Sequence, residues 1–281
     1  MRFSLVVATV GRSAEVRALL LSLQRQAVQS FEVIIVDQNA DDRLEPIVAE
    51  FSATMTILHM RTSLRLCNRA RNLGARHATG EIVTFPDDDC EYTQDVLEQA
   101  DRFFRTHPGH GFLTGTVLLP DGSFGRSGRW LKQDSAVDTQ TVWTSLIEFN
   151  LFVRREVFEE LGGFDEMIGP GTRFGSSEGQ DLALRMLARN VPGYYLYHLR
   201  IMHPDKPVSL NIARAFSYGL GAGRVMRKNR CDMRTVSQFL IRPAGGFVVN
   251  LVRLDMPIAR YYFLTFLGRL AGYRAQVAKA A

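Results

Sequence analysis

Short runs of β-branched and aromatic residues alternate with segments of helical periodicity in the N-terminal part of the chain. Each run has the length and composition of a buried strand. Strands that alternate with helices are typical of a parallel sheet with crossover helices, so the pattern predicts an α/β fold. The predicted strands are 3–8, 31–36, 55–60 and 81–85, and the predicted helices are 13–26, 41–51 and 70–78.

The pattern becomes less regular after residue 90, and two glycine-rich stretches interrupt it, 120–138 and 162–177. We expect 120–138 to be an exposed loop and 162–177 to be a long loop, and loops of that length inside a compact domain are usually functional or disordered. Ser177 lies three residues before Gln180, a capping-box spacing that predicts the start of a helix. The predicted helices are 93–106, 155–161 and 177–190, and the predicted strands are 112–119, 146–153 and 194–202.

The C-terminal part, from residue 208 onward, has a helical pattern. Pro243, with Gly245 and Gly246, predicts a break between two helices, 235–240 and 247–273. The second helix contains four charged residues, so it is not expected to span a membrane. The apolar run at 3–8 is also too short for a signal peptide or a spanning helix. We therefore expect a main domain at 1–205 and a helical, basic extension at 206–281.

Composition supports one main domain and reveals a basic tail. At 281 residues and 46% apolar content, the chain can bury one large core with an appendage. Residues 200–281 hold 14 Lys and Arg against 3 Asp and Glu, whereas the whole chain holds 34 against 29. A basic helix with interspersed aromatic residues, such as Phe247, Tyr261, Phe263 and Phe266, suits an anionic membrane surface, here through residues 235–277. Nucleic-acid binding and packing against protein, including a second subunit, are the alternatives.

The three cysteines are odd in number and widely spaced. That spacing fits neither a disulfide framework nor a cysteine-based zinc site, and it predicts reduced thiols. The expected location is therefore the cytoplasm. If the basic C-terminal helices bind a membrane, the protein is expected on its cytoplasmic face.

Three consecutive carboxylates, Asp87, Asp88 and Asp89, follow a predicted buried strand. Like charges this close raise one another's pKa unless a cation compensates them, and carboxylate oxygens are the ligands that Mg²⁺ and Mn²⁺ prefer. An acidic start to the following helix is the alternative. Asp37 also ends a strand, and strands of an open α/β sheet present ligands at their carboxyl ends, so all four carboxylates are expected in one crevice.

Further candidate residues are spread along the chain. Arg65, Arg69 and Arg71 form a cationic cluster suited to phosphate groups. Glu178 and Asp181 share a helix face and are candidates for a general base, although helix capping or an Asp181–Arg185 pair would also explain them. His203 follows the strand 194–202 and is either a metal ligand or a structural residue.

Several of these segments, taken in order, resemble the family 2 glycosyltransferases of the GT-A fold. Residues 5–12 (LVVATVGR) resemble the family's first strand and nucleotide-binding turn, and residues 31–37 (FEVIIVD) its second strand, which ends in a base-binding aspartate. Residues 69–75 (RARNLGA) and 80–90 (GEIVTFPDDDC) are similar to the segment around its metal-binding Asp-x-Asp motif. Three further segments resemble the family's acceptor half: GGFDE at 162–166, FGSSEGQDL at 174–182 and His203-Pro204.

The resemblance implies a GT-A domain with a Rossmann-like, mostly parallel sheet, a nucleotide-sugar half at about 1–110 and an acceptor half at about 111–205. It implies an inverting transfer from a nucleotide sugar to a glycan or lipid-linked acceptor, in polysaccharide or cell-envelope glycan biosynthesis, with Mn²⁺ or Mg²⁺. The implied metal ligands are Asp87, Asp89 and His203, and the implied bases are Glu178 first and Asp181 second. The implied substrate-binding residues are Thr9, Arg12, Asp37, Arg65, Arg71, Asp87, Asp88, Gly163 and Asp165.

One departure from the family pattern concerns the base. Many members have a second carboxylate where this chain has Gly179. A non-catalytic relative is therefore one alternative, and a sugar nucleotidyltransferase is another. The segment 8–12 has a single glycine, whereas nucleotidyltransferases usually have a glycine-rich loop there. No nucleic-acid-binding motif is present, so no nucleic-acid partner is expected, and a homo-oligomer remains open.

Overall fold

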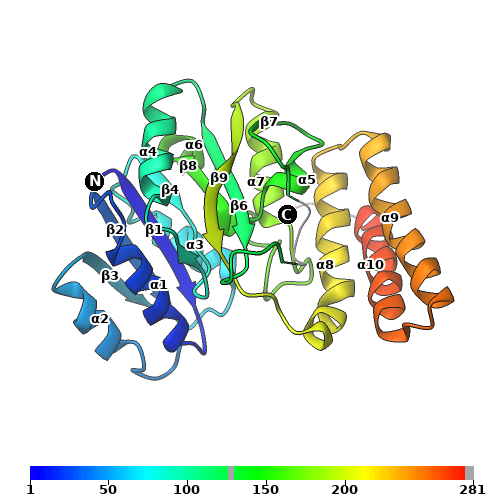
Figure 1. The fold of residues 1–281 in the computed structure, drawn as a ribbon, viewed down its shortest axis with the longest axis horizontal. Helices are drawn as coiled ribbons and strands as arrows, with labels where there is room; N and C mark the ends of the chain where they lie inside the picture. Colours follow the sequence, from blue (N-terminus) through cyan, green and yellow to red (C-terminus); the bar gives the residue numbers. More distant parts are fainter. Residues whose placement is uncertain (126–129, 276–281) are drawn as a thin grey trace, which may run out of the picture. The chain divides into compact units, whose positions relative to one another are not determined.

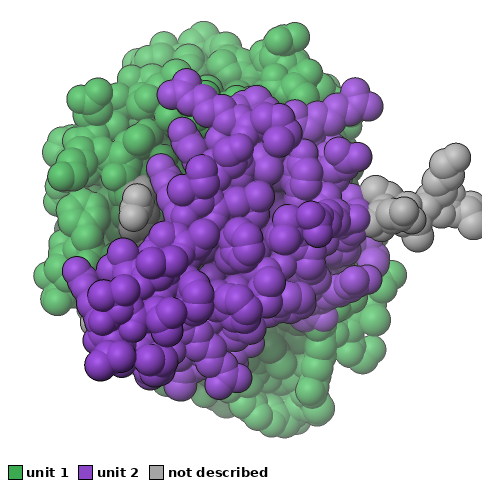
Figure 2. All heavy atoms as spheres, turned by 90° about the vertical axis from the view of Figure 1, so that its right-hand side faces the viewer, with its two compact units in different colours: residues 1–164, 182–205 green, residues 165–181, 206–281 purple. Residues whose placement is uncertain are grey.

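The computed structural model describes residues 1–125 and 130–275 of the chain. Two compact units are present, coloured green and purple in Figure 2. The first unit comprises residues 1–164 and 182–205, and the second comprises residues 165–181 and 206–281. The predicted division of the chain into domains at 1–205 and 206–281 stays a prediction.

The first unit is built on a mixed β-sheet in which most strands run in one direction. Among the described residues the strand order is β3-β2-β1-β4-β8-β6-β9-β5, with β7 paired to β9. β8, β5 and β7 run opposite to the other six strands. The strands are β1 (Phe3–Thr9), β2 (Phe31–Asp37), β3 (Thr56–Arg61), β4 (Ile82–Thr84), β5 (Glu91–Tyr92), β6 (Phe112–Leu118), β7 (Ser135–Val137), β8 (Leu151–Arg154) and β9 (Gly193–Met202). The predicted α/β fold with a mostly parallel sheet is confirmed.

Helices cover both faces of this sheet (Figure 1). Alternate residues of β1 point to opposite faces, and Phe3, Leu5 and Val7 form one core with apolar residues of two helices. On the other face a third helix approaches so closely that a Cβ at Gly74 would lie 2.6 Å from Val6. The first two helices are α1 (Ala14–Gln24) and α4 (Val96–Thr106), and the third is α3 (Cys67–Ala75). The remaining helical elements of the early chain are α2 (Glu45–Ser52), α5 (Val142–Ser145), α6 (Arg155–Glu160) and α7 (Glu178–Leu187).

The sheet topology brings distant segments to one edge. β1, β2 and β4 are parallel, and Thr9 and Asp37 are paired residues at the ends of their strands. β9 runs in the same direction, so its carboxyl end lies at the same edge. The loop after β4 and the residue after β9 therefore share this edge with Thr9 and Asp37.

Two local predictions in the first unit were wrong. The expected loop at 120–138 contains strand β7, which pairs with β9. The expected strand at 146–153 begins with a 3₁₀ turn, η1 (Glu148–Asn150), before β8. The side chain of Asn150 accepts a hydrogen bond from the Ile147 N–H at 3.0 Å and donates to the Gly115 carbonyl. Such side-chain bonds offer the backbone an alternative to the ladder, which explains the turn.

The second unit consists mainly of α8 (Val208–Lys228), α9 (Met233–Val252) and α10 (Met256–Arg274). α10 packs against both α8 and α9. The contact between α8 and α10 brings the two backbones together: a Cβ added at Gly223 would lie 2.0 Å from the Arg269 carbonyl oxygen. Glycine is required at such a crossing because any side chain would force the helices apart. None of the helices in the described part of the chain is long and apolar enough to cross a membrane.

The predicted helix break at Pro243 was wrong, because α9 continues through it. The break lies instead at residues 253–255. Proline cannot donate to the carbonyl of the residue four positions earlier, here Phe239. Arg269 of α10 donates to that carbonyl at 2.6 Å, and its guanidinium lies 4.5 Å from the Phe239 ring centroid. A charged donor from the neighbouring helix thus replaces the missing backbone hydrogen bond, although burial lowers the pKa of Arg269 to about 10.

This replacement predicts a coupling between Pro243 and Arg269. We expect Arg269→Leu to lower the free energy of unfolding by about 2 kcal/mol, because a buried carbonyl loses a charged donor. In a Pro243→Ala background the restored N–H serves Phe239, so the loss should fall to roughly half. Chemical denaturation of the four proteins measures the cycle, with exposed Arg274→Leu as the control. Equal losses in both backgrounds would contradict the explanation.

Candidate active site

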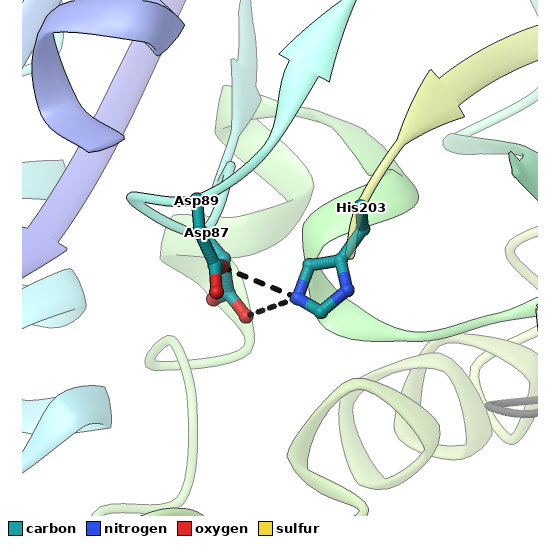
Figure 3. A group of neighbouring side chains, drawn as sticks. All are labelled: Asp87, Asp89 and His203. Carbon is teal, nitrogen blue, oxygen red and sulfur yellow. Dashed lines mark ion pairs between the residues drawn. The ribbon is translucent and has the colours of Figure 1, made fainter. Parts of the chain in front are cut away.

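Two aspartates and a histidine converge at the carboxyl edge of the sheet in the first unit. Asp87 and Asp89 lie in the loop after β4, and His203 directly follows β9; Figure 3 shows their side chains pointing toward one another. The His203 Nε2 atom lies 3.2 Å from Asp89 Oδ1 and 3.9 Å from Asp87 Oδ2. One ligand atom from each residue lies within 4.8 Å of the others.

This donor set fits a divalent cation. Two carboxylate oxygens and one imidazole nitrogen suit Mn²⁺, and the carboxylates also suit Mg²⁺. The His203 ring is held in place by stacking on Phe149, with ring centroids 4.6 Å apart and planes 7° from parallel. The side chains of His203 and Asp89 are each only 6% exposed, which restricts their movement. The grouping of the two aspartates with His203 is the arrangement expected of the implied metal ligands.

The third aspartate has a different environment. Asp88 accepts a hydrogen bond from the Thr9 hydroxyl at 2.7 Å and pairs with Arg12. Arg12 also reaches Asp89, where its Nη2 lies 2.8 Å from Oδ2, the oxygen opposite the one nearest His203. Arg12 therefore binds one side of Asp89 while the other side faces the histidine.

The pKa values reflect these pairings. Burial raises the pKa of Asp88 and Asp87 adds to the effect, whereas Thr9 and Arg12 oppose it. Burial alone would lower the pKa of Arg12, but Asp88 and Asp89 outweigh it and the pKa is raised. Arg12 is thus a permanent cation within the acidic cluster.

Asp87 has a cationic partner, Arg71, which also pairs with the buried Glu148. Arg71 is almost fully buried and pairs with Asp87 at 2.6 Å and with Glu148 at 3.6 Å. Burial raises the pKa of Glu148, and Arg71 opposes this rise. Arg71 was predicted to bind phosphate, but in this structure its guanidinium contacts protein carboxylates. Glu148 was missed; its signal is a single charge inside an apolar run.

Asp37 lies at the end of β2 and is fully buried. Its Oδ1 accepts hydrogen bonds from the Asn39 N–H at 2.8 Å and from the Asn39 side chain at 2.7 Å. Its Oδ2 lies 3.1 Å from Nε2 of His59 on β3. His59 was also missed, and its signal is a lone imidazole within the predicted strand 55–60.

A pocket of about 340 Å³ adjoins this aspartate. It is lined by residues that follow β2 and β3, namely Gln38, Asn39, Ala40, Arg61, Thr62, Ser63 and Arg65. Amide, hydroxyl and guanidinium groups together can bind a heterocyclic base or a phosphate. Arg65 is the predicted substrate residue that the structure puts in this pocket.

Glu178 and Asp181 belong to the first turn of α7, in the second unit, and both are buried. Asp181 has protein partners on both oxygens: Lys228 Nζ lies 2.8 Å from Oδ2, and the Asn229 side chain donates to Oδ1 at 2.9 Å. Lys228 also pairs with Asp165 at 2.8 Å. Asp181 and Asp165 thus join α7 and its preceding loop to α8, an arrangement that the sequence could not reveal.

Ser177 and Gly163 have unusual backbone conformations. Ser177, next to Glu178, has a φ of 74°, which is costly for a residue with a side chain. Gly163, in the first unit, has a φ of 75°, and a Cβ there would lie 2.6 Å from the Asn72 side chain. Its carbonyl accepts a hydrogen bond from Arg185 at 2.7 Å. The substrate-binding role expected for Gly163 and Asp165 stays a prediction.

Sequence comparisons give a consistent group of relatives. Residues 4–162 match the model of the family described as glycosyl transferase family 2. An uncharacterized glycosyltransferase of Haemophilus influenzae is 37% identical over 103 residues, and the chain spans about a third of its length. Glycosyltransferase AglE of Haloferax volcanii is 25% identical over 257 residues, which cover 84% of this chain and 80% of that protein. A Campylobacter jejuni GalNAc(5)-diNAcBac-PP-undecaprenol beta-1,3-glucosyltransferase is 25% identical over 142 residues, 48% of this chain and 45% of that protein.

Solved structures show the same fold. The mannosyltransferase PcManGT of Pyrobaculum calidifontis, in complex with GDP-Man and Mn²⁺, has a TM-score of 0.67 at 18% identity and covers 96% of this chain and 87% of its own. S. aureus TarS in complex with UDP-GlcNAc has a TM-score of 0.62 at 15% identity and covers 99% and 93%. At these identities the likeness establishes a GT-A architecture and no more.

Proposed function

Because the chain belongs to glycosyl transferase family 2, we propose that it is a metal-dependent, inverting glycosyltransferase. It would move a sugar from a nucleotide-sugar donor to a hydroxyl group of a glycan or lipid-linked acceptor. The observation that supports this best is the convergence of Asp87, Asp89 and His203 at the carboxyl edge of the sheet. Family membership also disfavours the sugar nucleotidyltransferase alternative.

The donor nucleotide is assigned to the first unit. Asp37 and the pocket lined by Asn39 and Arg65 offer hydrogen-bond acceptors and donors for a base and ribose. Thr9 ends β1 beside Asp37 and hydrogen-bonds Asp88, so it links the base region to the acidic loop. PcManGT and TarS were solved with GDP-Man and UDP-GlcNAc, which supports this class of donor.

The metal ion is assigned to Asp87, Asp89 and His203. When bound, the cation would supply positive charge to the diphosphate leaving group. The chain's own residues hold the ligands in place, because Arg71 pairs with Asp87, Arg12 pairs with Asp89, and Phe149 stacks on His203. Fixed ligands need little rearrangement as charge develops, which favours the transition state over the ground state. Polysaccharide or cell-envelope glycan biosynthesis is the proposed setting.

The general base is assigned to Glu178. An inverting transfer needs a carboxylate that removes the proton from the acceptor hydroxyl as the bond to the anomeric carbon forms. Both oxygens of Asp181 have structural partners, so Asp181 is the weaker candidate. The costly backbone conformation of Ser177 supports the assignment, because such strain is found mainly where function requires it.

Release of nucleoside diphosphate tests the proposed function directly. We expect one nucleotide sugar from a UDP, GDP and dTDP panel to be consumed when Mn²⁺ or Mg²⁺ and an acceptor are present. The same donor should raise the melting temperature, because it binds only the folded protein. EDTA should abolish turnover and Mn²⁺ should restore it. Donor binding without any turnover, across acceptors and metals, would point to a non-catalytic relative.

A further inference from the structure

Exposed aliphatic side chains gather at one end of the second unit, where α9 turns into α10. We name residues 248–256 the α9–α10 tip; Figure 1 shows the two helices running antiparallel on either side of it. Val252 is 78% exposed and Leu254 is 77% exposed. Ile241 extends the same face up α9, since it precedes Val248 by seven residues and Val252 by eleven. The exposed apolar residues of the tip are Val248, Val249, Leu251, Val252, Leu254 and Met256.

The conformation of Leu254 makes this apolar tip unusual. Leu254 follows the end of α9 with a φ of 59°, a left-handed conformation in which glycine is the common residue. The Asp255 N–H closes the helix end by donating to the Asn250 carbonyl at 3.0 Å. A leucine here strains the backbone, and its exposed side chain gains nothing from packing. Neither the local backbone conformation nor packing in the core explains why a leucine occupies this position. The side chain is therefore a candidate for contact with a partner outside the folded chain.

Exposed arginines lie within the tip and on the two helices that adjoin it. Arg242, Arg253 and Arg260 are exposed on α9, in the turn and on α10. Asp255 is the only acidic residue in the sequence from 233 to 275. Its carboxylate caps α10 by accepting a hydrogen bond from the Ile258 N–H at 3.2 Å. Asp255 is also exposed, so the tip itself holds one charge of each sign, and the positive excess comes from Arg242 and Arg260 on the two adjoining helices.

The aromatic residues that first indicated a membrane surface are not the ones most exposed. Phe247 and Phe263 pack on each other, with ring centroids 5.3 Å apart, and Phe263 is 42% exposed. Tyr261 and Phe266 are half-buried. The tip itself contains no aromatic residue, although protein interfaces are enriched in aromatic side chains. Exposed aliphatic side chains with arginines on the adjoining helices fit a lipid bilayer, whose interior is apolar and whose surface carries anionic headgroups.

We propose that the α9–α10 tip inserts into the headgroup region of an anionic phospholipid bilayer. The aliphatic side chains of Val248, Val252 and Leu254 enter the acyl boundary, and the arginines contact the phosphate groups. The helices on which the tip lies are closely packed, because α10 contacts the backbone of α8 at Gly223. This inference concerns a surface of the second unit and does not depend on the transfer reaction.

Vesicle co-sedimentation of the full-length protein, without donor or metal, tests the proposal. We expect binding to equimolar phosphatidylcholine–phosphatidylglycerol vesicles that weakens at high salt, and at least tenfold weaker binding to phosphatidylcholine alone. The variant Val252→Ser with Leu254→Gly should bind at least tenfold more weakly, since it loses two inserted side chains. Its melting temperature should not fall, because glycine relieves the left-handed position.

Two further variants separate the contributions. Arg253→Gln with Arg260→Gln should reduce binding to the anionic vesicles by about fivefold per arginine and leave binding to neutral vesicles unchanged. Leu58→Ser, at an exposed leucine of the first unit, should bind like the wild type. The proposal would be overturned if the wild-type protein did not bind anionic vesicles. It would also be overturned if the tip variant bound them as well as the wild type. A dimer in solution that the tip variant dissociates without any change in vesicle binding would overturn it too, because the tip would then contact a second copy.

Discussion

Asp89→Asn is expected to abolish metal-dependent sugar transfer while leaving the fold intact. The substitution keeps the size of the side chain but removes the charge from the oxygen that lies 3.2 Å from His203. A metal ion held at the proposed site would contribute several kcal/mol of transition-state stabilisation, so we expect kcat/KM to fall by about 10³-fold. Mn²⁺ affinity, measured by calorimetry in the absence of donor, should fall as well.

Two matched variants make the result specific. Asp121→Asn, at an exposed loop aspartate, should behave like the wild type. Asp88→Asn removes the neighbouring charge, but Asp88 is paired to Thr9 and Arg12 outside the three-residue group, so Mn²⁺ should still bind. Unchanged Mn²⁺ affinity in Asp89→Asn would refute the metal assignment, whatever the activity.

Glu178→Gln is expected to stop turnover without weakening donor binding. A general base contributes roughly 10²- to 10⁴-fold, so kcat should fall within that range while the KM for the donor stays constant. Steady-state kinetics with the donor found in the panel measures both constants. Glu156→Gln, at an exposed position on α6, is the control for a surface glutamate.

Asp181→Asn distinguishes a base from a structural carboxylate. Asp181 is fully buried, and removing its charge weakens its pairing with Lys228, so the melting temperature should fall. Turnover per folded molecule should remain far above that of Glu178→Gln. The opposite ranking of the two variants would move the base to Asp181.

Much of the first unit could be predicted from local sequence. The runs at 3–8 and 31–36 are apolar at nearly every position because their strands are buried on both faces, and they appear as β1 and β2 with small changes at the ends. Asp37 ends β2 and Asp87 lies in the loop after β4, so their place at the sheet edge was predictable from the parallel topology alone. The helix through Pro243 was not predictable, because the donor that makes it tolerable comes from Arg269 on another helix.

For the candidate site, too, one part could be predicted from the sequence and another part could not. The period of the apolar positions by itself determined the α/β architecture. The order of the sequence motifs by itself determined the acidic loop and the family. Only the tertiary structure decided that Arg12 pairs with Asp88 and Asp89, that Arg71 pairs with Asp87, and that Asp181 pairs with Lys228. The physical reason is that ion pairs and hydrogen bonds act over a few ångströms in space, and sequence separation carries no information about that distance.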